Sequence, residues 1–71
     1  MGSIRVRKDG KTFVVDENAT GSELKRELDL PPNSILVNAR NEMIGDNERI
    51  GNKVRDGEEV GSRPYYKYWN W

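Results

Sequence analysis

The chain has 71 residues, with no cysteine and no histidine, and its 12 basic and 12 acidic residues give a formal net charge of zero. This length allows one small domain, because so short a chain buries only about 60% of the surface that it exposes when unfolded. The composition excludes disulfides, cysteine-ligated metals and histidine as a general base, and it provides no global field to attract nucleic acid or an anionic membrane.

Residues 4–15 (IRVRKDGKTFVV) alternate between apolar and polar side chains, as half-buried strands do. Asp9 and Gly10 stand in the middle of this segment, where glycine can supply the positive φ that a tight turn requires. The segment therefore predicts a β-hairpin, with Phe13 and Val15 on the core side of its second strand.

A short helix is predicted after the hairpin. Thr20 and Glu23 have the spacing of a capping box, in which each side chain bonds the backbone N–H of the other residue. Leu24 and Leu28 are one turn apart and form the expected buried stripe, and the helix should end near Leu30 because Pro31 and Pro32 follow. The charged residues between these positions are expected to be solvated: Glu23, Lys25, Arg26, Glu27 and Asp29.

Three further strands are predicted in the second half. Residues 34–39 (SILVNA) form an apolar run of strand length, Met43 and Ile44 begin a short return strand, and Glu59 and Val60 open a last strand after the turn at 55–58. Pro64 should weaken the ladder because it has no N–H to donate. The residues expected to fill the core are Ile4, Val6, Phe13, Val15, Leu24, Leu28, Ile35, Val37, Ile50 and Val60.

The order of these elements resembles the ubiquitin-like β-grasp family, and more narrowly its branch of sulfur carriers and small archaeal protein modifiers. Val37-Asn38 before a turn, the segment Asp56-Gly57-Glu58-Glu59-Val60 and Pro64 shortly after it carry the resemblance. It covers roughly residues 3–64. It implies an α+β fold in which a mixed four- to five-stranded sheet packs on one helix, with residues 1–64 as the domain and 65–71 as a separate tail.

That branch acts through a C-terminal Gly-Gly that an ATP-dependent activating enzyme adenylates, and this chain departs from the pattern. Tyr68 and Trp69 stand about where the two glycines would be, and no Gly-Gly occurs anywhere in the chain. Because a narrow activating channel requires small residues, we expect this chemistry to be absent.

Five of the six aromatic residues lie in the last seven positions. An extended segment would place rings on both of its faces, whereas a small sheet has one core side, so some rings should stay accessible. Tyr, Trp and Arg are the residues that interfaces favour as anchors. We therefore predict that a protein partner, or a second copy, binds the residues Arg63, Tyr65, Tyr66, Lys67, Tyr68, Trp69 and Trp71.

Two alternatives stay open. One is a carrier or modifier activated after non-standard processing. The other is an RNA-binding module similar to the TGS domain, with basic residues on an exposed sheet face and tail rings that stack on bases. The basic residues concerned are Arg5, Arg7, Lys11, Arg40 and Arg63.

No catalytic residue, metal site or cofactor is predicted. Glu58 and Glu59 are adjacent and should point to opposite faces of a strand, and the segment around Asp46 and Glu48 is too short for a calcium-binding loop. No stretch is apolar enough for a signal peptide or a membrane span, so we expect a non-enzymatic, soluble, cytoplasmic protein that does not contact the membrane.

Overall fold

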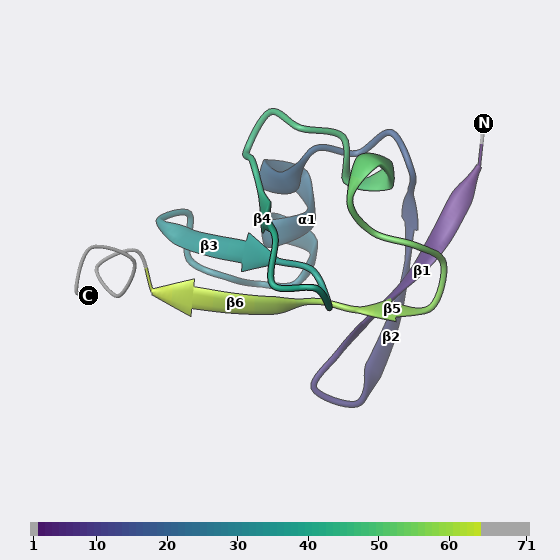
Figure 1. Ribbon diagram of the computed structural model, residues 1–71, viewed down its shortest axis with the longest axis horizontal. Helices are drawn as coiled ribbons and strands as arrows, with labels where there is room; N and C mark the ends of the chain where they lie inside the picture. The colour runs from purple at the N-terminus through teal and green to yellow at the C-terminus, as the bar shows by residue number, and fades with distance from the viewer. Residues whose placement is uncertain (1, 65–71) are drawn as a thin grey trace.

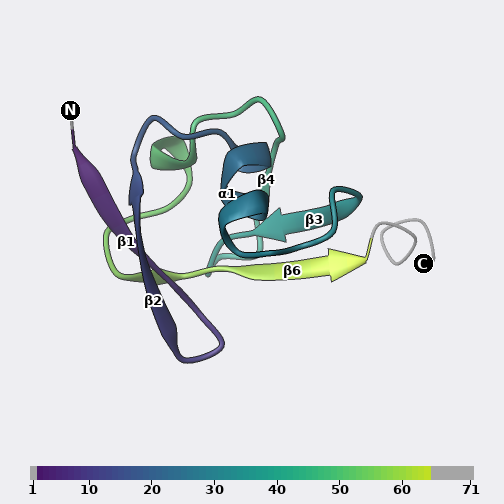
Figure 2. The same cartoon turned by 180° about the vertical axis from the view of Figure 1, so that it is seen from behind.

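The computed structural model describes residues 2–64. The chain forms strands β1 (Ser3–Lys8) and β2 (Lys11–Asp16), helix α1 (Gly21–Glu27), strands β3 (Ser34–Val37) and β4 (Met43–Ile44), a 3-10 turn η1 (Ile50–Asn52), and strands β5 (Glu58–Glu59) and β6 (Gly61–Pro64). Figures 1 and 2 show this arrangement from opposite sides. The predicted α+β class is confirmed, and α1 is the one α-helix among the described residues. No helix within residues 2–64 is long and apolar enough to cross a membrane.

The predicted hairpin is confirmed. β1 and β2 pair antiparallel over their whole length, from Ser3 opposite Asp16 to Lys8 opposite Lys11. The two turn residues, Asp9 and Gly10, have φ angles of 52° and 82°. Positive φ at both positions matches the right-handed twist of the strands, and glycine carries it without steric cost.

The predicted capping box is also present in α1. Glu23 N donates to Thr20 Oγ1 at 3.3 Å, and Thr20 N donates to Glu23 Oε1 at 2.9 Å. The helix ends at Glu27, earlier than the predicted end near Leu30, because Asp29 turns the chain with a φ of 58°. Leu30 N then bonds Lys25 O at 2.8 Å and Asp29 N bonds Arg26 O at 3.1 Å, which satisfies the last carbonyls of the helix.

The described strands form two three-stranded sheets, in the orders β2-β1-β5 and β4-β3-β6, so the prediction of one four- to five-stranded sheet is wrong in its strand numbers. β1 is parallel to β5, whereas β3 is antiparallel to β6. Val60 alone separates β5 from β6, and the ribbon of the two strands runs on in one direction (Figure 1). The chain changes its pairing partner at Val60, which divides the strands between two sheets.

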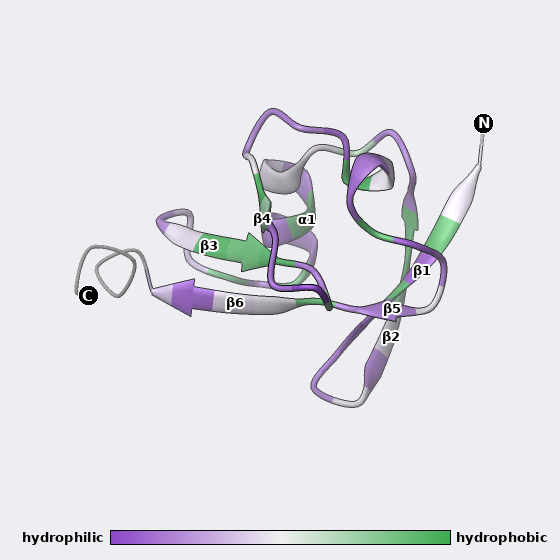
Figure 3. Cartoon of the chain, viewed as in Figure 1, coloured by the Kyte–Doolittle hydropathy of each residue, from purple (hydrophilic) through white to green (hydrophobic). Residues whose placement is uncertain are grey.

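The core lies between α1 and these strands. Its buried members are Ile4, Val6, Val15, Leu24, Leu36, Ile44, Ile50, Val54 and Val60, with Phe13, Ala19, Leu28 and Leu30 packed against them. Figure 3 shows the corresponding apolar segments of β1, β2 and β3. Within β3 the prediction of Ile35 as a core residue is wrong: Leu36 points into the core, and Ile35 is half-buried on the other side. Val37 is buried but lies outside this cluster.

Candidate functional site

Arg63 is the one predicted partner-binding residue that lies within the described part of the chain. It is exposed on β6, directly opposite Ile35 of β3, and its Nη1 donates to Ser62 O at 3.1 Å. The other six, Tyr65, Tyr66, Lys67, Tyr68, Trp69 and Trp71, lie outside the described residues. The site can therefore be built from the surface that surrounds the end of β6.

We call this surface the β6 face and define it by Ile35, Met43, Gly61 and Arg63, which lie around buried Val37. Opposite residues of paired antiparallel strands share a face, and the register pairs Ile35 with Arg63, Val37 with Gly61, and Val37 with Met43. Leu36 points the other way, into the core. The β6 face is thus the side of the β4-β3-β6 sheet that lies away from the core.

The β6 face combines apolar side chains with one cation. A Cβ placed on Gly61 would lie 3.4 Å from both Arg63 Nη1 and Val37 Cγ2, so the guanidinium lies over the glycine beside this methyl group. Met43 is 54% exposed, one of two large apolar side chains among residues 2–64 that are so accessible. Exposed apolar area next to arginine is the composition that protein interfaces favour.

A groove of about 360 Å³ opens at the beginning of β3, lined by Lys25, Pro32, Asn33, Ser34, Ile35, Ile44 and Asp46. Ser34 pairs with Pro64, the last described residue. The groove therefore lies close to the point at which the chain continues into the tail.

Lys25 lies at the base of this groove, and the prediction that it is solvated is wrong: the residue is only 5% exposed. Its Nζ donates to Pro32 O at 2.7 Å and to Ser34 O at 3.0 Å, and it pairs with Asp46 Oδ1 at 2.7 Å. All three ammonium hydrogens thus have acceptors. The ammonium joins α1 to β3 and to the loop after β4, so it serves the fold and is not a free charge for a ligand.

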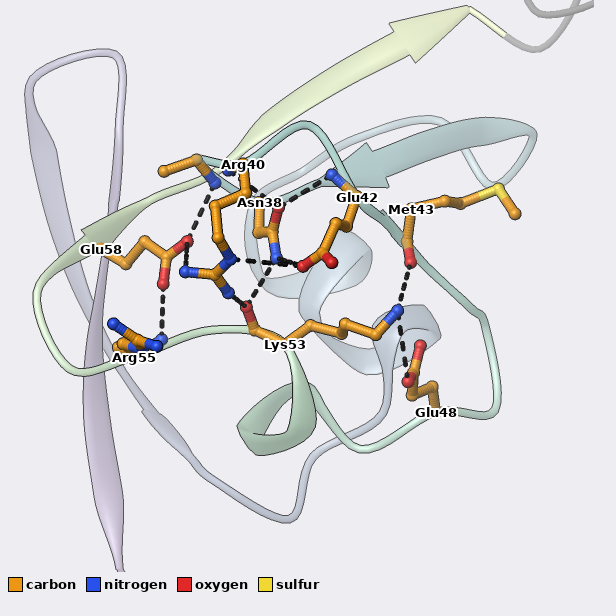
Figure 4. A network of polar contacts seen from close by, with 9 residues as sticks. Asn38, Arg40, Glu42, Met43, Glu48, Lys53, Arg55 and Glu58 are labelled. Carbon is orange, nitrogen blue, oxygen red and sulfur yellow. Dashed lines mark hydrogen bonds and ion pairs between the residues drawn. The ribbon is translucent and has the colours of Figure 1, made fainter.

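A second polar network holds the loop between β3 and β4, with Asn38 at its centre (Figure 4). The Asn38 side chain is 3% exposed and uses both ends of its amide. Nδ2 donates to Lys53 O at 2.8 Å and to Glu42 Oε1 at 2.9 Å. Oδ1 accepts from Arg40 N at 3.0 Å and from Glu42 N at 2.9 Å.

The same network engages Arg40 and Glu58. Arg40 donates to Lys53 O at 2.8 Å, and its Nη1 lies 3.5 Å from Glu58 Oε2. Burial, the largest single influence on the Glu58 pKa, acts to raise it, but the N–H donors of Arg55 and Ala39 and the charges of Arg40 and Arg55 outweigh this, and the pKa is lowered. Glu58 is therefore a structural carboxylate held in its ionised form.

Replacing Asn38 with alanine should lower the free energy of unfolding by about 2–3 kcal/mol, because Arg40 N and Glu42 N would lose their acceptor, while Lys53 O would keep Arg40 as its donor. Urea unfolding of the wild type and the variant measures this difference. Alanine at exposed Asn47 is the matched control and should change stability by less than about 0.5 kcal/mol. If Asn38→Ala loses no more unfolding free energy than Asn47→Ala, the network has no structural role.

The basic residues proposed to contact RNA do not form a free positive surface. Arg5 makes a bidentate pair with Asp56, with Nε to Oδ1 at 3.2 Å and Nη2 to Oδ2 at 2.9 Å, and Arg40 lies against Glu42 and Glu58. Arg7 lies opposite Glu59 in the ladder of β1 and β5. Among residues 2–64, Lys11 and Arg63 are the members of this set with no acidic partner in an ion pair or in register. The arrangement thus gives no support to RNA binding.

The Arg5–Asp56 pair makes a prediction about acid stability. Hydrogen bonds from the side chain and backbone of Arg5 lower the pKa of Asp56 from its usual 3.8 to about 2. A carboxylate with a lowered pKa stabilises the fold above its unfolded-state pKa, and this contribution is lost as the pH falls through its folded-state pKa. The stabilising effect of Asp56 should therefore be complete above about pH 4 and should disappear towards pH 2.

The melting temperature of the wild type should accordingly fall more steeply between these pH values than that of Asp56→Asn. Because the pKa values of Glu42 and Glu58 are also lowered, the stability of the variant should still fall to some extent with pH. Parallel curves for the two proteins would contradict the contribution assigned to the pair.

The remaining carboxylates considered in the sequence either form ion pairs or point in different directions. Glu58 points inward and Glu59 is exposed. Asp46 pairs with Lys25, and Glu48 Oε2 lies 3.8 Å from Lys53 Nζ. Within residues 2–64, no group of three acidic residues lies close enough together to hold a metal ion.

Sequence reasoning missed the roles of Lys25, Asn38 and Met43. Asn38 did carry a signal, because asparagine before a turn bonds backbone N–H groups a few residues on, as it does at Arg40 and Glu42. Lys25 carried no such signal in the sequence, since its acceptors come from segments that meet the helix only in the folded chain. No family model matches the chain, and the curated proteins contain no match to it.

Proposed function

We propose that this chain is a non-catalytic, ubiquitin-like β-grasp domain that binds a protein partner through the β6 face and the aromatic tail, residues 65–71. The order of neighbouring strands supports the family. Because β5 and β6 follow each other through Val60, the two sheets can be read as one strand order, β2-β1-β5/β6-β3-β4. In this order β1 and β5 form the single parallel pair. A mixed set of strands with one helix against it is the arrangement that the resemblance implies.

The observation that carries the binding proposal is the position of Arg63. It is the last side chain before Pro64 on the β6 face and lies opposite half-buried Ile35, while exposed Met43 lies on the same face across β3. The strand that bears it leads directly into five aromatic residues. Arginine, tyrosine and tryptophan are the residue types that most often dominate binding energy. The β6 face and the tail together therefore form a continuous recognition element along the chain.

The proposed domain binds without undergoing acyl activation. Tyr68 and Trp69 are too large for a channel that admits only glycine, so an activating enzyme with ATP should form no adenylate on this chain. Detection of such an adenylate would support the carrier alternative and contradict the proposal.

A capture experiment tests the binding itself. The immobilised full chain should retain one or more proteins from a cell extract that Trp69→Ala/Trp71→Ala and Arg63→Glu fail to retain. Arg26→Ala, on the exposed side of α1, is the matched control and should capture the same proteins as the wild type. The retained protein is then purified and titrated against all four chains. Equal affinity for the wild type and the tail variant would overturn the proposal.

A further inference from the structure

The outer edge of β2 presents an unpaired strand. Among the described residues β2 pairs with β1 alone. The two-residue turn makes Lys8 and Lys11 a hydrogen-bonded pair, so the backbone groups of residues 11, 13 and 15 face β1. Glu17 N continues this alternation by donating to Gly2 O at 3.0 Å. The backbone groups of Thr12 and Val14 consequently face outward, as does Asp16 N, whereas Asp16 O accepts from Ala19 N at 3.0 Å.

This edge carries exposed apolar area and lies beside an acidic groove. Val14, at its centre, is 68% exposed. A groove of about 280 Å³ runs between β2 and α1, lined by Val14, Val15, Asp16, Ala19, Glu23, Leu24 and Glu27. Its lining has three carboxylates and no basic side chain. A strand that pairs with this edge should therefore bring a cation to the end of β2 that borders the groove.

The segment Lys11–Glu17 (KTFVVDE) is complementary to its own antiparallel copy. With Val14 opposite Val14, Phe13 meets Val15, Thr12 meets Asp16 and Lys11 meets Glu17. Lys11 and Glu17 are both exposed, and neither has an ion-pair partner among residues 2–64. We propose that β2 pairs antiparallel with β2 of a second copy, with Val14 on the two-fold axis.

The geometry favours this register over its neighbours. Opposite residues must share a face, so only registers that pair odd with odd and even with even positions are allowed. The alternative centred on Phe13 places Lys11 against Val15 and creates no opposite-charge pair. In the Val14 register the two Val14 residues bond each other across the axis, and Asp16 N of each copy can donate to Thr12 O of the other, because Asp16 O already accepts from Ala19 N. This register brings Lys11 of each copy next to Glu17, at the acidic end of the groove.

The pairing would join the two β2-β1-β5 sheets into one six-stranded sheet. The β6 face lies on the other sheet and stays free, so each dimer would present two copies of it. Because pairing of two edge strands covers little area, the dimer should be weak and dependent on concentration.

Sedimentation equilibrium of the full chain, from micromolar to millimolar concentration, tests the proposal. The wild type should dimerise, and Lys11→Glu and Glu17→Lys should each weaken dimerisation by about tenfold, because each places like charges opposite each other twice. The double variant Lys11→Glu/Glu17→Lys reverses both charges and should restore wild-type affinity. A wild type that stays monomeric at millimolar concentration would overturn the proposal, as would a double variant no better than the single ones.

Nuclear magnetic resonance of a mixture of labelled and unlabelled chains tests the register. Phe13 and Val15 form a non-hydrogen-bonded pair across the axis, so their Hα atoms should give an intermolecular Overhauser effect. A dimer that lacks this contact, or one that Trp69→Ala/Trp71→Ala abolishes while the charge reversals have no effect, would assign association to the tail and overturn the β2 interface.

Discussion

Replacing Gly21 with alanine should lower the free energy of unfolding by about 3 kcal/mol or more. Gly21 is the first residue of α1 and is buried against the loop after β4. A Cβ at this position would overlap Gly45 O, a backbone atom that no side-chain rotation can move. The helix and the loop would have to separate, which would break the bonds from Gly21 N to Glu48 O and from Ser22 N to Asp46 O, each 3.0 Å long.

The matched control is alanine on the other side of the same contact. A Cβ on Gly45 would lie 3.6 Å from Glu48 Cβ, an ordinary contact distance. Gly45→Ala should therefore change stability by less than about 1 kcal/mol. Denaturant unfolding of the two variants measures the difference. If both lose the same stability, the close approach of α1 to the loop is not what requires glycine at position 21.

Replacing Lys25 with methionine should cost about 3 kcal/mol of unfolding free energy. Methionine keeps most of the aliphatic stem, but it leaves Pro32 O, Ser34 O and the Asp46 carboxylate without their common donor. Since Asp46 is 62% exposed, water can replace its share of the interaction, and the larger loss comes from the two carbonyls.

Two further variants separate these contributions. Asp46→Asn should cost less than about 1 kcal/mol, because it removes only the ion pair, whose carboxylate is exposed to water, and leaves both carbonyl acceptors of Lys25 in place. Arg26→Met, next to Lys25 but exposed, should be close to neutral. Thermal unfolding of the three proteins gives the comparison. A Lys25→Met protein as stable as Arg26→Met would show that the ammonium is dispensable.

Lys25 also explains how the open edge of β3 is closed. On the β4 side of β3, Asn38 N donates to Glu42 O, and alternate residues along β3 face the same side, so the backbone of Ser34 also faces this edge. β4 pairs only with Leu36 and Val37 and does not extend as far as Ser34. Ser34 N bonds Pro31 O at 3.0 Å, and Ser34 O accepts from Lys25. The lysine thus takes the place of a missing strand partner, whereas the edge of β2 has no such cover among the described residues.

Local patterns predicted the local structure well. The alternation of residues 4–15 and the spacing of Thr20 and Glu23 specify the hairpin and the capping box with neighbouring residues alone, and both are confirmed. The helix ends before the predicted position because proline marks only where a helix cannot continue, whereas Asp29 ends it earlier by adopting positive φ.

Features that depend on distant segments could not be predicted. The run of residues 35–37 is apolar throughout, so it has no alternation to show that Leu36, and not Ile35, points into the core. Lys25 follows buried Leu24 in α1, and the helical period predicts an exposed side chain at this position. It is covered only because residues 31–34 fold back over it. The change of partner at Val60 likewise follows from pairing with β1 and β3, which lie far from it in sequence.

Fluorescence quenching by acrylamide tests the central claim most directly, because Trp69 and Trp71 are the two tryptophans of the chain. In the full chain at micromolar concentration, where the β2 dimer should be dissociated, we expect both indoles to be readily quenched, and adding the captured partner should protect them. If both are already shielded in the isolated chain, and Trp71→Ala lowers the melting temperature without altering any association, the rings belong to the core and do not bind a partner.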